Sequence, residues 1–390
     1  MQQFNFTRLE SVISGAGSIS AIGAELDRRG AKRAVVITGA SLGRSRLLAR
    51  VTDALGPRCA GVCANAGEHA PAGAVRTMAV ELERLDADAI VSFGGGSAID
   101  SAKVAAASRI MGRDMTLQAG ALDFARAFDP APAGGLLHIA VPTTLSAGAF
   151  TPGGGVTDEA THRKAAVIDA RLQPAVVIHD GELCVETPDQ LWVSTGVRVL
   201  DHAVETIYAR RAHPLSSALA VRAIAMITEH LAPSRGADAA AVAHRGQCLD
   251  AAWLSLFGGF NTGLGLSHAL GHQIGPAFGV PHGVTSCLAL APAMRVMAQV
   301  APGRFADIAE GLRLPFDPDH PREAALACAD AVEAFIAGFD VPTRLRQLGV
   351  DADRAATLAP AVLEELTLFD AMDGPLSLAQ IAELLRVIAG

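Results

Sequence analysis

The chain has 390 residues, of which 50% are hydrophobic and 18% charged, with a formal net charge of -8. An acidic chain with 4% aromatic residues lacks the basic field and the stacking rings that nucleic acid binding requires, so we expect no nucleic-acid partner. The length allows two domains with sizeable cores. The N-terminal residues show no basic stretch followed by an apolar one, and the six cysteines form no CxxC pair, so we expect a cytoplasmic protein with reduced thiols.

The first half of the chain alternates short runs rich in Val and Ile with amphipathic runs. Strands are expected at 33–38, 88–93, 136–144, 164–169 and 175–180. Such alternation is typical of βαβ units and a mostly parallel sheet. From about Thr187 the pattern is helical, with helices expected at 189–211, 214–231, 238–257, 262–275, 284–300, 302–312, 322–338, 352–369 and 377–389. We therefore predict an α/β domain over residues 1–183 and an all-α domain over residues 184–390.

A run of glycines stands where an expected strand meets an expected helix. Gly94, Gly95, Gly96 and Ser97 occupy this turn, and Asp100 follows one helical turn later. Consecutive glycines let the backbone approach an anion, and the first N–H groups of the following helix point toward it. The turn therefore favours a pyrophosphate, although a plain tight turn is the alternative and the GxGxxG pattern is absent.

Gly39 follows the expected strand at 33–38. Dinucleotide sites that select NAD over NADP commonly place an acidic residue near the end of such a strand, where it binds the ribose 2′-hydroxyl. Glycine carries no charge that would repel a 2′-phosphate. If this turn holds the adenosine ribose, we expect both NADH and NADPH to be used.

Residues 251–294 contain no Asp, Glu, Lys or Arg, yet they include three histidines, His268, His272 and His282. His268 and His272 are four residues apart and share one face if the segment is helical. His282 follows a turn rich in Gly and Pro that could return it to the same place. The pattern indicates a metal or catalytic cluster, or three separate histidines in a helical core. A membrane span is disfavoured because glycines and prolines interrupt the segment.

Several motifs together resemble the iron-containing (group III) alcohol dehydrogenase family. They are "GGGSAIDSAK" at 94–103, "PTT" at 142–144, Lys164 in "HRKAAVID", "TGVRVLDHAVE" at 195–205 and "SHALGHQIGPAFGVPHG" at 267–283. The resemblance implies a dehydroquinate synthase-like fold, with a dinucleotide-binding α/β domain, a helical domain and an active site in the cleft between them. It also implies a set of cofactor contacts. These are Gly39, Gly94, Gly95, Gly96, Ser97, Asp100, Thr143, Thr144 and Lys164.

The resemblance also identifies the positions that hold a divalent ion in metal-dependent members of the family. These are an Asp and a His four residues apart and two later histidines, and here they are occupied by Arg198, His202, His268 and His282. An arginine cannot ligate a cation, and its positive charge repels one. We therefore expect no bound metal.

The Arg198 exchange is similar to the maleylacetate reductase branch of the family, as are "EHAP" at 68–71 and "LSAGAFTP" at 145–152. Members of this branch reduce the carbon–carbon double bond of maleylacetate to 3-oxoadipate with NADH or NADPH during the degradation of aromatic compounds. Ala149 and residues 371–377 depart from the pattern of the branch. The apolar helical domain also suggests a homodimer.

This resemblance implies that Arg198 and His202 bind a small dicarboxylate substrate. The candidate catalytic residues are histidines, of which His272 matches the family histidine that does not bind metal and lies near the nicotinamide. The full set is His272, His268, His282 and His202.

Other interpretations remain open at this point. The chain could be a metal-dependent alcohol or polyol dehydrogenase that uses three histidines and water, a catalytically silent nucleotide-binding relative, or a zinc-dependent lyase similar to dehydroquinate synthase. By spacing alone, Arg198 could instead form an ion pair with Asp201 or Glu205 on its own helix.

Overall fold

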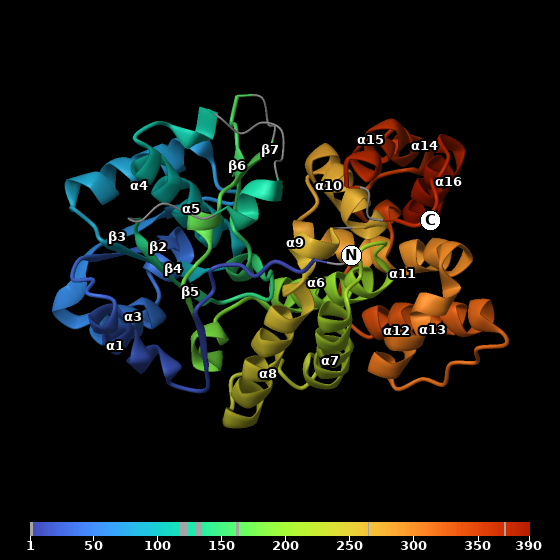
Figure 1. The fold of residues 1–390 in the computed structure, drawn as a ribbon, viewed down its shortest axis with the longest axis horizontal. Helices are drawn as coiled ribbons and strands as arrows, with labels where there is room; N and C mark the ends of the chain where they lie inside the picture. The colour runs from blue at the N-terminus through green and yellow to red at the C-terminus, as the bar shows by residue number, and fades with distance from the viewer. Residues whose placement is uncertain (1–2, 118–123, 130–134, 161–163, 264, 370–371) are drawn as a thin grey trace. The chain divides into compact units, whose positions relative to one another are not determined.

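The computed structural model describes residues 3–117, 124–129, 135–160, 164–263, 265–369 and 372–390 (Figure 1). The chain divides into two compact units. The α/β unit comprises Asn5–Thr187 and Gly236–Leu249, and the helical unit comprises Pro188–Arg235, Asp250–Gly390 and the described residues of Met1–Phe4. The first part of helix α8 (Ala239–Leu256) therefore belongs to the α/β unit, whereas the sequence pattern had assigned the whole of 184–390 to the helical domain.

A six-stranded parallel sheet forms the centre of the α/β unit, in the order β1-β8-β5-β4-β2-β3. The strands are β1 (Ser11–Ser14), β2 (Ala34–Gly39), β3 (Cys59–Ala66), β4 (Ala89–Gly94), β5 (Leu137–Pro142) and β8 (Val176–His179). Strands β4 and β8 are buried along their whole length, as is typical of parallel strands covered on both faces. The mostly parallel sheet is confirmed. Strands β1 and β3 were not predicted, because they lack the continuous Val and Ile runs of the others.

Strands β6 (Gly153–Thr157) and β7 (Lys164–Ile168) form a separate antiparallel pair. The expected strand at 164–169 exists, but its assignment to the parallel sheet was wrong. Fewer than a dozen residues separate β6 from β7. A parallel pair needs a crossover connection of about a dozen residues or more. The short connection therefore produces a hairpin.

Helices cover both faces of the parallel sheet. Val35 and Ile37 pack with residues of α4 (Ala72–Arg84) and α5 (Gly96–Met111), whereas Val36 packs with residues of α1 (Ile22–Arg28) and α3 (Arg46–Leu55). Successive side chains of β2 point to opposite faces, so one apolar strand contributes to both cores. Helix α5 begins directly after β4, which places the glycine turn at the carboxyl edge of the sheet.

The helical unit consists of helices packed around α11. Its helices are α6 (Asp189–Tyr208), α7 (Pro214–His230), α9 (Gly259–Thr262), α10 (Leu266–Phe278), α11 (His282–Val300), α12 (Phe305–Leu312), α13 (Pro321–Ala337), α14 (Ala352–Ala356), α15 (Ala359–Phe369) and α16 (Leu378–Ala389). Helix α11 packs against α6, α10 and α13. One predicted helix, 352–369, is divided by a break after Ala356. The short helix α9 was not predicted; it ends at Gly263, which has φ 83°, and the predicted helix 262–275 corresponds to α10.

Among the described residues, one helix is long and apolar enough to cross a membrane by length and composition. This helix is α11, and 78% of its most apolar window is buried in the protein. Burial of this extent is expected of an interior helix, which is apolar on all sides.

Candidate functional site

Helix α6 carries a buried stripe of ionisable side chains. Arg198, Asp201, His202 and Glu205 are at most 6% exposed, and their spacing of three and four residues places them on one side of the helix. Burial of charged and polar groups is costly unless they are paired or hydrogen-bonded. The hydrogen-bond partners of these four side chains therefore indicate which groups this part of the helical unit can bind.

Glu205 accepts hydrogen bonds from the start of helix α10. Its Oε2 accepts from the Gly265 N–H at 2.8 Å, and its Oε1 accepts from the Ser267 N–H at 2.6 Å. These first N–H groups of a helix have no partner within the helix, and Gly265 has no side chain to supply one. Burial raises the pKa of Glu205 to about 7, while the N–H donors act in the opposite direction.

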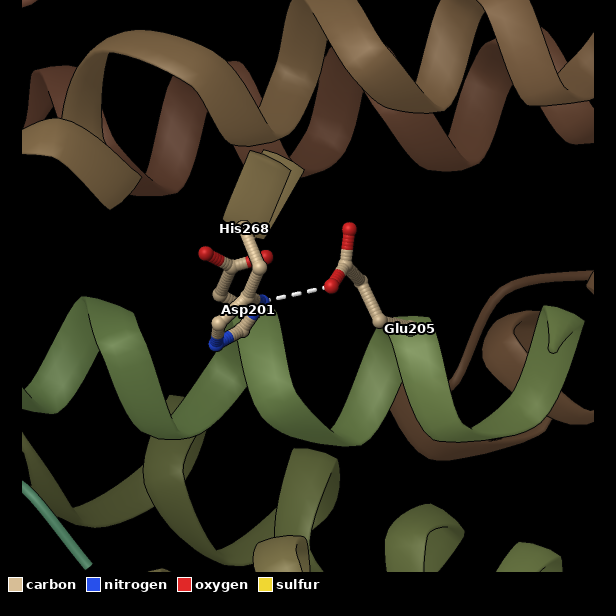
Figure 2. A group of neighbouring side chains, drawn as sticks. All are labelled: Asp201, Glu205 and His268. Carbon is tan, nitrogen blue, oxygen red and sulfur yellow. Dashed lines mark hydrogen bonds and ion pairs between the residues drawn. The ribbon is translucent and has the colours of Figure 1, made fainter. Parts of the chain in front are cut away.

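His268 is oriented by the same carboxylate. Its Nδ1 lies 2.5 Å from the Oε2 of Glu205, and Figure 2 shows the imidazole of α10 facing the two acidic side chains of α6. Because a carboxylate accepts, we assign the proton to Nδ1, which leaves the lone pair on Nε2. That Nε2 atom is buried and has no partner among the described residues. His268 therefore presents an acceptor, and burial lowers its pKa to about 3.

Asp201 is held by two serine hydroxyls. Its Oδ2 accepts from Ser267 at 3.0 Å and from Ser286 on α11 at 2.6 Å. The Oδ1 atom is buried without a partner in the described part of the chain. Burial raises the pKa of Asp201 to about 6, while the donated hydroxyl of Ser286 and the nearby charge of Arg198 act in the opposite direction.

Arg198 is 6% exposed and makes two long hydrogen bonds. Its Nη1 donates to the carbonyl oxygen of His282 at 3.4 Å and to the Oγ of Ser286 at 3.3 Å. Among the described residues no ion pair joins Arg198 to Asp201 or Glu205, so the ion pair that spacing alone allowed is not formed. Burial lowers the pKa of Arg198 to about 10, and the guanidinium is still charged at neutral pH.

The four histidines predicted as site residues form one cluster. The ring centroids of His202 and His268 are 5.0 Å apart, those of His268 and His272 are 6.1 Å apart, and those of His272 and His282 are 5.3 Å apart. Arg198 reaches the same cluster through the carbonyl of His282. Helix α11 begins at His282, so the turn at 279–281 returns this side chain to α10 as the sequence suggested.

Sequence reasoning missed two partners of this cluster. Glu365 on α15 contacts His272 through its Oε1 and Nδ1 of the imidazole, and its Oε2 accepts from Gln273 at 2.6 Å. Ser286 connects Arg198 to Asp201. Glu365 lies 93 residues after His272 in the chain, so no local spacing could reveal the contact. Ser286 lies one helical turn after His282, a spacing that could have suggested it.

Three side chains of the cluster come close enough to share a divalent ion. Potential ligand atoms of Asp201, Glu205 and His268 lie within 4.8 Å of one another. The oxygens of Glu205 already accept from N–H donors, however, and Nδ1 of His268 faces them. After burial, the charge of Arg198 is the next largest cause that lowers the pKa of both His202 and His268. The same field opposes a cation added beside His202 and His268.

The glycine turn of the α/β unit forms a close-fitting cradle. Gly94 has φ 149°, which favours glycine. An added Cβ at Gly95 would lie 3.0 Å from the Cγ2 of Thr144, and one at Gly96 would lie 3.3 Å from the Oγ of Ser146. The hydroxyls of Thr144 and Ser146 are buried and have no partner among the described residues. Together with the uncapped N-terminus of α5, they fit a phosphate group.

The other predicted cofactor residues lie in the same unit. The Thr143 N–H donates to the Gly94 carbonyl at 3.0 Å, and the Ser97 hydroxyl accepts from the His69 N–H at 3.0 Å. Asp100 lies in the first half of α5, and Gly39 is the last residue of β2. Lys164 is the first residue of β7, but its side chain lies outside the described part of the structure.

Comparison with known proteins covers most of the chain. Residues 10–181 match the family model described as iron-containing alcohol dehydrogenase, and residues 192–388 match that described as Fe-containing alcohol dehydrogenase family, C-terminal. The NAD-dependent methanol dehydrogenase of Bacillus methanolicus is 29% identical over 93% of this chain and 94% of its own length. The maleylacetate reductase of Burkholderia cepacia is 32% identical over 72% of both chains. The solved structure of the alcohol dehydrogenase from Oenococcus oeni aligns with a TM-score of 0.90 at 25% identity, covering 99% of this chain and 100% of that one.

Proposed function

This chain belongs to the iron-containing alcohol dehydrogenase family of oxidoreductases, and we propose that it reduces the carbon–carbon double bond of maleylacetate to 3-oxoadipate with NADH or NADPH and without a metal ion. We further propose that it acts as a cytoplasmic homodimer in the degradation of aromatic compounds. One observation supports the proposal most strongly: a buried arginine, Arg198, contacts the histidine cluster through the carbonyl oxygen of His282.

A buried guanidinium suits a dicarboxylate better than an alcohol. Arg198 makes hydrogen bonds of 3.3 and 3.4 Å within the protein, both to neutral acceptors. A carboxylate would offer it a charge-assisted, bidentate partner, which is the geometry that arginine binds best. A metal-dependent alcohol dehydrogenase needs a Lewis acid to stabilise an alkoxide. A dicarboxylate enone brings its own negative charge, and Arg198 can bind it directly.

The reaction balances without a metal. When bound, the reduced nicotinamide supplies a hydride to one alkene carbon, and the electron pair of the double bond moves toward the carbonyl oxygen to give an enolate. Arg198 supports the negative charge that develops on the substrate, because a fixed cation in a buried site interacts strongly with it. A histidine of the cluster then donates one proton to the neighbouring carbon. Overall, maleylacetate, the reduced cofactor and one proton are converted to 3-oxoadipate and the oxidised cofactor.

Two features of the α/β unit support the use of both cofactors. The cradle formed by Gly94, Gly95 and Gly96 suits the pyrophosphate that NADH and NADPH share. Gly39, at the end of β2, supplies no carboxylate that would select the ribose 2′-hydroxyl over a 2′-phosphate. We therefore expect similar catalytic efficiency with the two cofactors.

A second candidate is a metal-dependent alcohol dehydrogenase. The observation in its favour is the approach of Asp201, Glu205 and His268, whose potential ligand atoms lie within 4.8 Å of one another. The similarity to the methanol dehydrogenase of Bacillus methanolicus favours it as well. In this case the ion would have to bind beside the charge of Arg198, which is the reason that we prefer the metal-independent reaction.

A panel of substrates separates these functions. Purified enzyme is mixed with NADH and maleylacetate, with a neutral enone of similar length, or with short aldehydes, and cofactor oxidation is followed. We expect turnover of maleylacetate, and we expect Arg198→Lys, which keeps the charge but loses the bidentate geometry, to lower kcat/KM for it at least about tenfold. Faster turnover of aldehydes than of maleylacetate would favour the alcohol dehydrogenase. No turnover of any compound would indicate a catalytically silent relative.

A further inference from the structure

Helix α10 carries two histidines that each face a carboxylate through Nδ1. His268 faces Glu205, and the two side chains are 0% and 1% exposed. His272 faces Glu365, and these side chains are 31% and 14% exposed. In both pairs the carboxylate accepts the Nδ1 proton and leaves Nε2 as the nitrogen that can react. The pairs differ in their access to water, which indicates different roles.

His268 is unsuited to donate a proton. Its side chain is fully buried, its Nε2 carries a lone pair, and a positive charge on its ring would be opposed by Arg198. His272 is partly exposed, so its Nε2 can recover a proton from water after each turnover. Its ring also lies next to that of His282, at a centroid distance of 5.3 Å, which keeps it within the cluster. A proton donor must both reach the site and be recharged, and His272 meets both requirements.

Glu365 is fixed in place on both sides. One oxygen contacts Nδ1 of His272, and the other accepts from the side-chain amide of Gln273 at 2.6 Å. Helix α15, which carries Glu365, packs against α10, and apolar residues of both helices belong to one core cluster. The carboxylate therefore has little freedom to leave the imidazole. An oriented imidazole with a carboxylate on Nδ1 is a common arrangement for a histidine that transfers protons through Nε2.

We propose that Glu365 is the positioning residue that holds His272 as the proton donor of the reduction. This inference rests on the proposed function. After hydride transfer, the proton on Nε2 of His272 moves to the substrate carbon next to the one that received the hydride. The enolate collapses to the ketone, and His272 is left neutral with its Nδ1 proton bound to Glu365. Water then returns a proton to Nε2, so that the site is restored without any other reactant.

The decisive variant is Glu365→Gln, and its matched control is Glu364→Gln, which makes the same change at an exposed position of the same helix. Replacing the Glu365 carboxylate with an amide keeps its size and removes its charge. For Glu365→Gln we expect kcat to fall about 100-fold, KM and NADH affinity to change less than about threefold, and the solvent deuterium isotope effect on kcat to rise. For Glu364→Gln we expect kcat to change less than about threefold. A larger KM with an unchanged isotope effect in Glu365→Gln would show a merely structural role and overturn the proposal.

A measurement that needs no substrate completes the test. In protein labelled with ¹⁵N at histidine, the ring nitrogen shifts of His272 report which nitrogen is protonated. We expect Nδ1 to carry a proton in the wild type, both in the imidazolium and in the neutral ring, and we expect a changed tautomer balance in Glu365→Gln. A neutral wild-type ring with its proton on Nε2 and none on Nδ1 would overturn the positioning role. If wild-type enzyme does not reduce maleylacetate, the proposed function fails, and the nitrogen shifts still decide whether Glu365 orients His272.

Discussion

Arg198 on α6 donates from Nη1 to the Oγ of Ser286 on α11, at a distance of 3.3 Å. The hydroxyl of Ser286 donates its proton to the Oδ2 of Asp201 at 2.6 Å, so its lone pairs are left to face the guanidinium. Asp201 and Arg198 form no direct ion pair among the described residues, yet one serine connects them. The position of Arg198 therefore depends on a side chain of another helix.

Substitution of Ser286 tests this connection. In Ser286→Ala, Arg198 loses one of its two acceptors, and we expect KM for maleylacetate to rise about tenfold, since a hydrogen bond to a charged group contributes about 1.5–3 kcal/mol. The matched control is Ser267→Ala, which removes the other hydroxyl from the same oxygen of Asp201 and does not contact Arg198. Steady-state kinetics of both variants measure the difference. Equal increases in KM would show that Ser286 acts only through Asp201.

A methyl group added to the glycine cradle tests whether NADH binds there. A methyl group at Gly95 would lie 3.0 Å from the Cγ2 and 3.1 Å from the Oγ1 of Thr144, so this side chain would have to move. We expect Gly95→Ala to weaken NADH binding about tenfold, measured by fluorescence titration. In the control Gly246→Ala, the added carbon meets nothing within 4 Å, and NADH affinity should not change. Unaltered NADH binding in Gly95→Ala would place the pyrophosphate elsewhere.

We expect the choice between NADH and NADPH to depend on Gly39. Its φ of -80° suits any residue, and an added Cβ would lie 3.4 Å from the Ala66 carbonyl oxygen, so larger side chains can be accommodated. We expect Gly39→Asp to lower kcat/KM for NADPH at least about tenfold and to leave that for NADH within about threefold. Gly39→Asn controls for size without charge. A similar loss for both cofactors in Gly39→Asp would show that the ribose does not lie there.

His138 makes the stability of the protein depend on pH. It is buried in β5, its Nε2 lies 2.8 Å from the Oγ of Ser92, and burial, followed by the charge of Lys103, lowers its pKa to about 3. The unfolded chain binds a proton at this histidine below about pH 6.5, whereas the folded protein does not until about pH 3. Stability that is present above pH 6.5 is therefore lost as the pH falls through this window, by at most about 1.4 kcal/mol per pH unit.

Urea unfolding at pH 7 and pH 5 measures this contribution. Between these values the wild type should lose about 2 kcal/mol more of its free energy of unfolding than His138→Gln, which keeps a hydrogen-bonding group but does not titrate. The comparison between the two proteins removes the contributions of the other buried groups, because both proteins contain them. Parallel pH profiles would show that the pKa of His138 is the same in the folded and unfolded protein.

Local sequence patterns were enough to predict most of the sheet and the approach of His268, His272 and His282, whereas His202 was added by the family resemblance. Runs of Val and Ile specify the central strands, and the four-residue spacing of His268 and His272 places both on one face of α10. The alternative pairing of Arg198 with Asp201 was wrong for a physical reason that spacing does not contain. Asp201 receives two hydroxyl donors from other helices, and these take the place of the guanidinium.

Contacts between distant segments could not be predicted from one sequence. Glu365 meets His272 across 93 residues, and Ser286 meets Arg198 across 88. Glu365 is an ordinary polar residue of a helix with no periodic signal that marks it. Ser286 is marked only by its position one helical turn after His282. Strand β3 was missed because Ala, Gly and Cys replace the usual β-branched residues, and its pairing with β2 stabilises it instead.

In the reaction that we propose, Arg198 binds a dicarboxylate where related enzymes use a metal ion. The rate of NADH oxidation with maleylacetate is measured for enzyme dialysed against EDTA, with bound metals quantified by elemental analysis. We expect an unchanged rate with no metal above background. Loss of the rate on chelation, with recovery on addition of Fe²⁺ or Zn²⁺, would contradict it.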